Sequence, residues 1–192
     1  VVFDIDGTLT ETNELIFATF NYIAGKYLNR HFTPQEITAM FGPTEEVVIE
    51  RLVGSERYPP AAADFFDFYK SSFHSMASLH DGMLDILKFL KEKRILLAVF
   101  TGKGSHSTDI TLQELGIRDY FDMIVTGHDV TKHKPSSEGI QKVIERLKLN
   151  PDEVLMIGDA VSDVKAAHGA GIPISAVVWD SYGRDKVMQM ET

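Results

Sequence analysis

The chain has 192 residues, 44% of them hydrophobic, which suffices for the core of one domain or of one domain that carries an insertion. The formal net charge of −9 argues against nucleic acid and anionic membranes as partners, because neither surface would attract the chain at long range. Cysteine is absent, which excludes disulfides and thiolate chemistry and favours a reducing compartment, so we expect a cytoplasmic protein.

The first predicted element is a short buried strand at residues 1–3, and Asp4 and Asp6 follow it directly. Two like charges so close together at the end of a buried strand are unfavourable unless a cation offsets them. This pair of aspartates is therefore the first sign of a functional site.

From about residue 12 to residue 77 the chain contains signals for helices and no convincing strand. Thr33 opens a capping box with proline at the first helical position. Thr44 is followed by two glutamates and begins a further helix, which Gly54 can end. Two aromatic-rich amphipathic segments lie at residues 15–28 and 61–76. We therefore predict a small all-helical domain in this part of the chain.

Four more apolar runs beyond the helical insertion predict strands, at residues 95–100, 123–126, 154–157 and 174–179. Amphipathic helices are predicted among them at residues 82–93 and 137–149. This alternation indicates an α/β fold with a doubly wound, Rossmann-like parallel sheet and a helical domain inserted after its first strand. The predicted domains are a core of residues 1–11 and 78–192 and a cap of residues 12–77.

Polar residues suited to phosphate chemistry follow four of the predicted strands. They are Asp4 and Asp6, then Thr101 and Gly102, then Lys134, and finally Asp159 and Asp163. Ligands of a doubly wound sheet bind outside the carboxyl ends of its strands. We therefore expect these residues to converge on one site.

The residue types at these strand ends suit phosphoryl transfer. Three carboxylates can form a hard oxygen site for Mg²⁺, namely those of Asp4, Asp6 and Asp159. A metal-bound aspartate can attack phosphorus, and a second carboxylate two residues on can protonate the leaving oxygen and then deprotonate water. The Thr101 hydroxyl and the Gly102 N–H can hold phosphoryl oxygens, while Lys134 neutralises their charge.

Four segments resemble, in order and across nearly the whole chain, the four motifs of the haloacid dehalogenase-like hydrolases. They read F-D-I-D-G-T at 3–8, F-T-G-K at 100–103, K-P at 134–135 and G-D-A-V-S-D at 158–163. The helical insertion is similar to the type-one cap of the phosphoglycolate-phosphatase-like members. In that branch Gly42 would lie near the cap loop, here residues 41–44, that reaches toward the substrate and helps to bind it.

The resemblance implies a role for each motif residue. Asp4 would be the nucleophile and Asp6 the acid/base, and Thr101 and Lys134 would bind the phosphoryl group. Mg²⁺ would be held by Asp4, by the backbone carbonyl of Asp6 and by Asp159. Asp163 would orient the lysine or a metal-bound water. Lys132 is an alternative candidate for the lysine.

We thus predict a Mg²⁺-dependent phosphatase that hydrolyses a small phosphomonoester, such as a phosphoglycolate-like compound, a sugar phosphate or a nucleotide, through an aspartyl phosphate. The expected partner is a small phosphorylated metabolite, and the chain is expected to be a monomer or a homodimer. One competing hypothesis is an inorganic pyrophosphatase, whose family members the stretch at 12–16 resembles slightly. A second is a sugar-phosphate mutase, and a third is a non-enzymatic phosphoacceptor or binding module.

Overall fold

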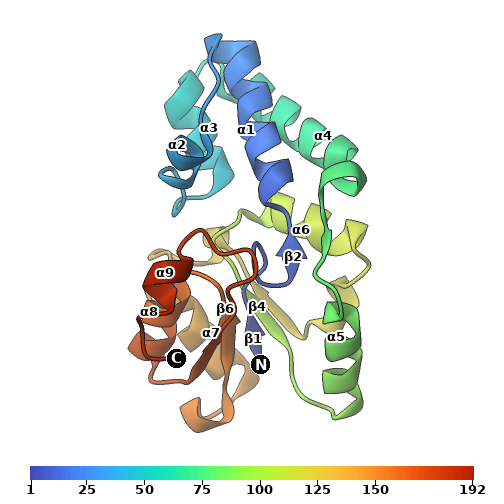
Figure 1. Ribbon diagram of the computed structural model, residues 1–192, viewed down its shortest axis with the longest axis vertical. Coiled ribbons are helices and arrows are strands. Elements are labelled where there is room, and N and C mark those ends of the chain that lie inside the picture. The colour runs from blue at the N-terminus through green and yellow to red at the C-terminus, as the bar shows by residue number, and fades with distance from the viewer.

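The computed structural model describes all 192 residues and shows an α/β core with a layer of helices above it (Figure 1). The core contains a five-stranded sheet of order β5-β4-β1-β6-β7, in which every neighbouring pair is parallel. Its strands are β1 (Val2–Phe3), β4 (Ala98–Phe100), β5 (Met123–Val125), β6 (Met156–Gly158) and β7 (Ile174–Ala176). The strand order reverses between β1 and β6, which confirms the predicted doubly wound sheet.

The two faces of the sheet carry alternate residues of each strand, as the period of two in a strand requires. Val2 and Phe100 belong to one buried cluster, which also contains residues of α7 (Glu138–Leu147) and α8 (Val161–Ala170). Phe3 and Val99 belong to another, on the side of α5 (Met83–Glu92) and α6 (Ser105–Glu114). Helices therefore cover both faces, which is why the strands read as continuous apolar runs.

The strands are shorter than the apolar runs that predicted them. Ile95 and Leu96 precede β4 and are exposed, at 36% and 41% of their surface. The run that begins at Ile174 leaves the sheet after Ala176, and Trp179 is exposed in the following loop. Hydrophobicity alone therefore overestimated how far the pairing extends.

The insertion consists of α1 (Asn13–Leu28), α2 (Pro34–Thr38), α3 (Glu45–Val53) and α4 (Tyr58–Met76), which confirms the predicted helical cap. Its buried side chains form a cluster that also includes Ile110 of the core helix α6, and aromatic rings such as those of Phe20, Phe65 and Tyr69 pack against one another within it. The predicted capping box is present, since the Glu36 N–H donates to Thr33 and the Thr33 N–H donates to Glu36. No helix of the chain is both long and apolar enough to cross a membrane.

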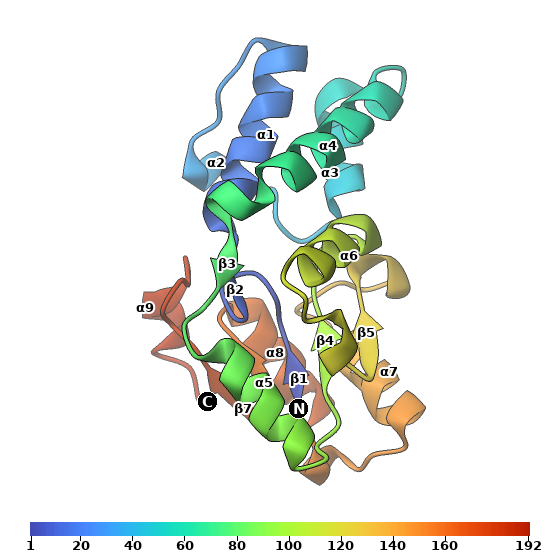
Figure 2. The same cartoon turned by 90° about the vertical axis from the view of Figure 1, so that its right-hand side faces the viewer.

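Two short strands that the sequence did not reveal join the cap to the core. β2 (Thr10–Glu11) and β3 (Ser78–Leu79) pair in antiparallel fashion where the chain enters and leaves the cap (Figure 2). Each has only two residues, so neither produces a detectable alternation. Their pairing places both crossings side by side.

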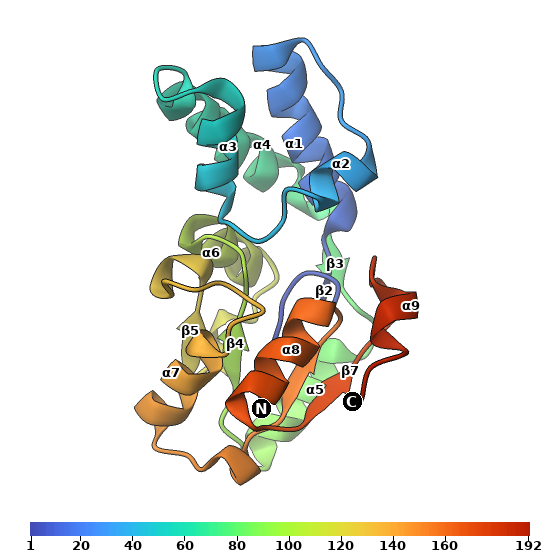
Figure 3. The same cartoon turned by 90° about the vertical axis from the view of Figure 1, so that its left-hand side faces the viewer.

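Two helices of the core, α6 and α8, were also not foreseen, and α9 (Arg184–Val187) follows them near the C-terminus (Figure 3). The buried face of α6 includes the hydroxyl residues Ser107, Thr108 and Thr111, which conceal its amphipathic period. Thr111 donates its hydroxyl proton to the backbone carbonyl of Ser107 one turn earlier, so it can be buried without an apolar side chain.

Replacing Gly139 with Ala is expected to lower the free energy of unfolding by about 1–3 kcal/mol. Gly139 lies in the first turn of α7, and a Cβ there would overlap the ring of Phe100, which directly precedes Thr101. Gly25→Ala is the matched control, because a Cβ at Gly25 in α1 meets no atom within 4 Å. Urea denaturation measures the free energy of unfolding of both variants. Equal stability of Gly139→Ala and the parent would contradict this packing.

Candidate active site

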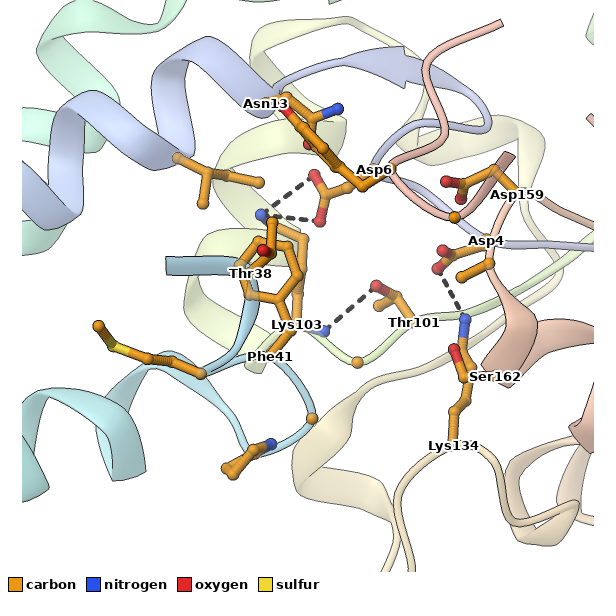
Figure 4. A pocket seen from close by; sticks show the side chains of 18 of the residues that line it. Asp4, Asp6, Asn13, Thr38, Phe41, Thr101, Lys103, Lys134, Asp159 and Ser162 are labelled. Carbon is orange, nitrogen blue, oxygen red and sulfur yellow. Dashed lines mark hydrogen bonds and ion pairs between the residues drawn. The ribbon is translucent and has the colours of Figure 1, made fainter. Parts of the chain in front are cut away.

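The carboxyl edge of the sheet brings the predicted site residues together beneath the cap (Figure 4). Asp4 follows β1, Thr101 follows β4 and Asp159 follows β6, while Lys134 reaches the same place from the loop before α7. They line an open cavity of about 520 Å³ whose opposite wall belongs to the cap. The topology thus assembles residues that are up to 155 positions apart, from Asp4 to Asp159.

Lys134 is held between two carboxylates. Its Nζ lies 2.8 Å from Asp4 Oδ1 and 2.6 Å from Asp163 Oδ1. The second oxygen of Asp163 accepts a hydrogen bond from the Ala160 N–H at 3.0 Å, so this carboxylate orients the lysine. Lys132 is exposed, and its N–H donates to Glu138 away from the cavity. Lys134 is therefore the lysine of this site.

Burial alone would lower the pKa of Lys134, but the carboxylates of Asp163 and Asp4 outweigh it and hold this pKa above its usual range. The ammonium is consequently charged, and its Nζ also lies 5.0 Å from the centre of the Phe100 ring. A permanent positive charge beside Asp4 suits a group that must neutralise a phosphoryl oxygen.

Asp4, Asp159 and Asp163 form the acidic cluster, with one oxygen of each within 4.8 Å of the others. Asp163 uses both oxygens to bind Lys134 and Ala160, and Asp159 Oδ1 accepts from the Thr8 hydroxyl at 3.1 Å. One oxygen each of Asp4 and Asp159 is left without a hydrogen bond inside the chain. Two such carboxylates, with water and substrate oxygens, are the ligand set that Mg²⁺ commonly takes.

Gly7 leaves room beside this cluster. Its φ of +77° lies in the left-handed region, and a Cβ there would come within 2.7 Å of Asp159 Oδ2. Only glycine lets the chain turn this closely past the Asp159 carboxylate, so the free oxygen remains open. The residues present therefore fit a magnesium ion.

The pKa of Asp159 is raised to about 8, chiefly by burial and then by the neighbouring Asp4 and Asp163. That of Asp4 is raised to about 6, again chiefly by burial, although Lys134 acts in the opposite direction. Without a metal, the folded chain thus favours protonation of these carboxyls.

In the absence of divalent ions, the parent protein should lose stability relative to Asp159→Asn as the pH rises from about 4 to 8. A carboxyl whose pKa rises on folding from roughly 4 contributes stability that is fully present below the unfolded value and is lost as the pH rises through the folded value near 8. Asn cannot ionise and shows no such loss. Melting temperatures in EDTA measure the difference, and Mg²⁺ should reverse it. A difference independent of pH would contradict the assigned burial of this charge.

The carboxylate of Asp6 turns away from the acidic cluster. Its oxygens lie 3.1 and 3.3 Å from Lys103 Nζ, and Oδ1 accepts a hydrogen bond from the Thr12 hydroxyl at 2.5 Å (Figure 4). The expectation that three carboxylates, including that of Asp6, would share one oxygen site is corrected accordingly. Thr12 and Lys103 instead hold the Asp6 side chain on the cap side of Asp4.

Lys103 is a site residue that the sequence interpretation missed. Its side chain is only 4% exposed and lies between Asp6 and Glu45, at 3.7 Å from the Glu45 carboxylate, with the Tyr69 ring centre at 4.9 Å. The available signal was its position directly after Thr101-Gly102 in the second motif. That position says nothing of its partners, which come from the first motif and from the cap.

Glu45, the first residue of α3, docks the cap onto the core. Its carboxylate accepts hydrogen bonds from the Gly104 N–H and from the Ser107 hydroxyl, both at 2.6 Å. These donors lie at the N-terminus of α6, where the helix dipole favours a negative charge. A Cβ at Gly104 would come within 2.6 Å of the neighbouring Glu46, so glycine allows this close contact.

The loop between α2 and α3 descends from the cap toward the core (Figure 3). Phe41 and Gly42 line the cavity, in agreement with the predicted cap loop. Thr44 does not line it: the residue is 2% exposed and its methyl group faces Gly127 of the core. The expectation that Thr44 faces the substrate is therefore wrong, because its position at the start of α3 directs it into the interface.

The Rossmann-like sheet, the helical cap and the aspartate-lysine site at the strand ends define the class of capped α/β hydrolases. The chain belongs to the family described as haloacid dehalogenase-like hydrolases, which it matches over residues 1–177. The enzyme class predicted from the sequence, a phosphatase of this family, is confirmed at that level.

Three relatives illustrate the range of substrates in their names. The "Pyrophosphatase PpaX" of Bacillus pumilus is 29% identical over 98% of this chain and 87% of its own length. A "putative beta-phosphoglucomutase" structure from Thermotoga maritima is 30% identical over 92% of this chain and 84% of its own, with a TM-score of 0.72. A "predicted phosphoglycolate phosphatase" from Haemophilus somnus has a TM-score of 0.82, covers 94% of this chain and 85% of its own, and at 21% identity shows the fold alone.

Proposed function

We propose that the chain is a Mg²⁺-dependent phosphatase that hydrolyses a small phosphomonoester through an aspartyl phosphate on Asp4. The observation that carries this proposal is the contact of Asp4 with Lys134, beside the free oxygen of Asp159 and below the Asp6 carboxylate. A nucleophile, a cation for the phosphoryl group and an acid/base thus surround one cavity.

Thr101 and Gly102 are placed to hold the phosphoryl oxygens. The Thr101 hydroxyl accepts a hydrogen bond from the Lys103 N–H at 3.2 Å, which leaves its own proton free to donate. The Gly102 N–H has no acceptor within the chain, and Gly102 lines the cavity. Both donors and the Lys134 ammonium act on the charge that spreads over these oxygens in the transition state.

In the first step an oxygen of Asp4 forms a bond to phosphorus as the bond from phosphorus to the leaving oxygen breaks. Asp6 donates its proton to that oxygen, so the alcohol leaves neutral. In the second step Asp6 takes a proton from water, the water oxygen attacks phosphorus, and inorganic phosphate and free Asp4 are produced. Mg²⁺, which Asp4, Asp159 and the Asp6 carbonyl would hold, supplies positive charge that offsets the phosphate.

Hydrolysis of p-nitrophenyl phosphate with Mg²⁺ tests the proposal. Sustained turnover that stops on chelation and returns with Mg²⁺ is the expected result. A single stoichiometric burst would indicate a phosphoacceptor module instead, and unchanged turnover in excess EDTA would contradict the metal requirement.

Inorganic pyrophosphate is a second candidate substrate, because the PpaX relative is named for it. A panel of phosphates ranked by kcat/KM separates the candidates. Formation of an isomeric sugar phosphate, rather than free phosphate, would identify a mutase.

A further inference from the structure

The cap side of the cavity is mainly apolar. Its cap residues are Asn13, Ile16, Phe20, Thr38, Met40, Phe41, Gly42, Pro43, Glu45 and Val48. Glu45 is the single charged residue among them, and it is negative. The leaving group of a substrate held at Asp4 extends away from the strand ends, where it meets this wall, while Tyr182 and Lys186 of the C-terminal segment line a further side of the cavity.

The two buried lysines of the cavity are both paired with carboxylates. Lys134 is bound by Asp4 and Asp163, and Lys103 lies between Asp6 and Glu45. The third lining lysine, Lys186, has no carboxylate partner, but it is exposed on α9, in the C-terminal segment, and does not belong to the cap wall.

We propose that the leaving group of the natural substrate is an alcohol with an apolar body and no negative charge of its own. This inference rests on the proposed function and names its substrate class. A leaving phosphate or carboxylate would enter a wall that carries Glu45 and apolar side chains, and it would lose hydration without gaining a cationic partner. An apolar alcohol would be desolvated favourably against Phe20, Met40 and Phe41.

The test compares benzyl phosphate with its 4-carboxylate derivative, which has the same reacting group and one added charge, and with pyrophosphate and 2-phosphoglycolate. With the Mg²⁺-loaded protein, kcat/KM for benzyl phosphate should exceed that of each anionic compound at least about tenfold. Equal or better hydrolysis of the carboxylate derivative or of pyrophosphate would overturn the inference while leaving the phosphatase itself established. Failure to hydrolyse any phosphate, p-nitrophenyl phosphate included, would instead reject the proposed function.

Glu45→Gln should lower the ratio of kcat/KM for benzyl phosphate to kcat/KM for its 4-carboxylate derivative at least about threefold. The substitution removes the negative charge of Glu45 and keeps an oxygen that can accept the hydrogen bond from the Gly104 N–H. Glu50→Gln, an exposed change on the same helix outside the cavity, should leave the ratio unchanged. If Glu45→Gln does not fold, Met40→Lys serves instead: a cation added to the wall should raise activity on the anionic compounds. An unchanged ratio in the folded variant would contradict the inference.

Discussion

Asp4→Asn is expected to reduce kcat by at least about 10³-fold, because the amide cannot form the acyl phosphate. The variant should fold, since Asn has nearly the same shape and Asp4 lies in a crowded acidic cluster with Asp159 and Asp163. Without metal its melting temperature should equal or exceed that of the parent, because burial disfavours the charged Asp4 carboxylate more than Lys134 favours it. Steady-state hydrolysis of p-nitrophenyl phosphate and thermal unfolding in EDTA measure the two effects.

Trapping of the intermediate checks the same step independently. Acid quenching during turnover should yield a phosphorylated peptide that contains Asp4. Because water is expected to attack phosphorus rather than the Asp4 carbonyl carbon, turnover in ¹⁸O-water should label the released phosphate and leave Asp4 unlabelled. Absence of the phosphorylated peptide, or retention of more than a few per cent of kcat in Asp4→Asn, would reject the covalent mechanism.

Lys134→Met is expected to be the second most damaging change. Lys134 bridges Asp4 and Asp163, and Asp163 is completely buried, so the substitution leaves two carboxylates without their cation. Breaking a buried ion pair in this way should lower metal-free stability by about 3 kcal/mol, and losing the phosphoryl-binding charge should lower kcat/KM by about 10²-fold or more.

The metal response distinguishes this effect from general misfolding. Because Lys134 competes with a cation for Asp4, Mg²⁺ should raise the melting temperature of Lys134→Met more than that of the parent. Lys132→Met is the matched control, since Lys132 is exposed and outside the cavity, and it should change neither activity nor stability appreciably. A larger loss of activity in Lys132→Met than in Lys134→Met would transfer the role to Lys132.

Local sequence patterns sufficed to predict the sheet and most of the site. Asp4, Thr101 and Asp159 each follow a short apolar strand, and parallel strands end at one edge, so their convergence could be inferred from local pattern alone. The cap helices could also be predicted from the sequence, because the Thr33 capping box is made by residues three positions apart. Such features depend on neighbours in the chain, which is the range that sequence patterns report.

The environment of Asp6, the proposed acid/base, follows in contrast from tertiary packing. Lys103 contacts Asp6, which is 97 positions away, and Glu45, which belongs to a separately packed helical layer, and nothing local indicates either contact. The same holds for Thr44, whose burial follows from the docking of α3 against the core. The local sequence pattern determines which strand end a residue follows. The direction of its side chain and the partners of that side chain depend on how the cap packs against the core. The physical reason is that this packing decides which charged groups are buried next to one another.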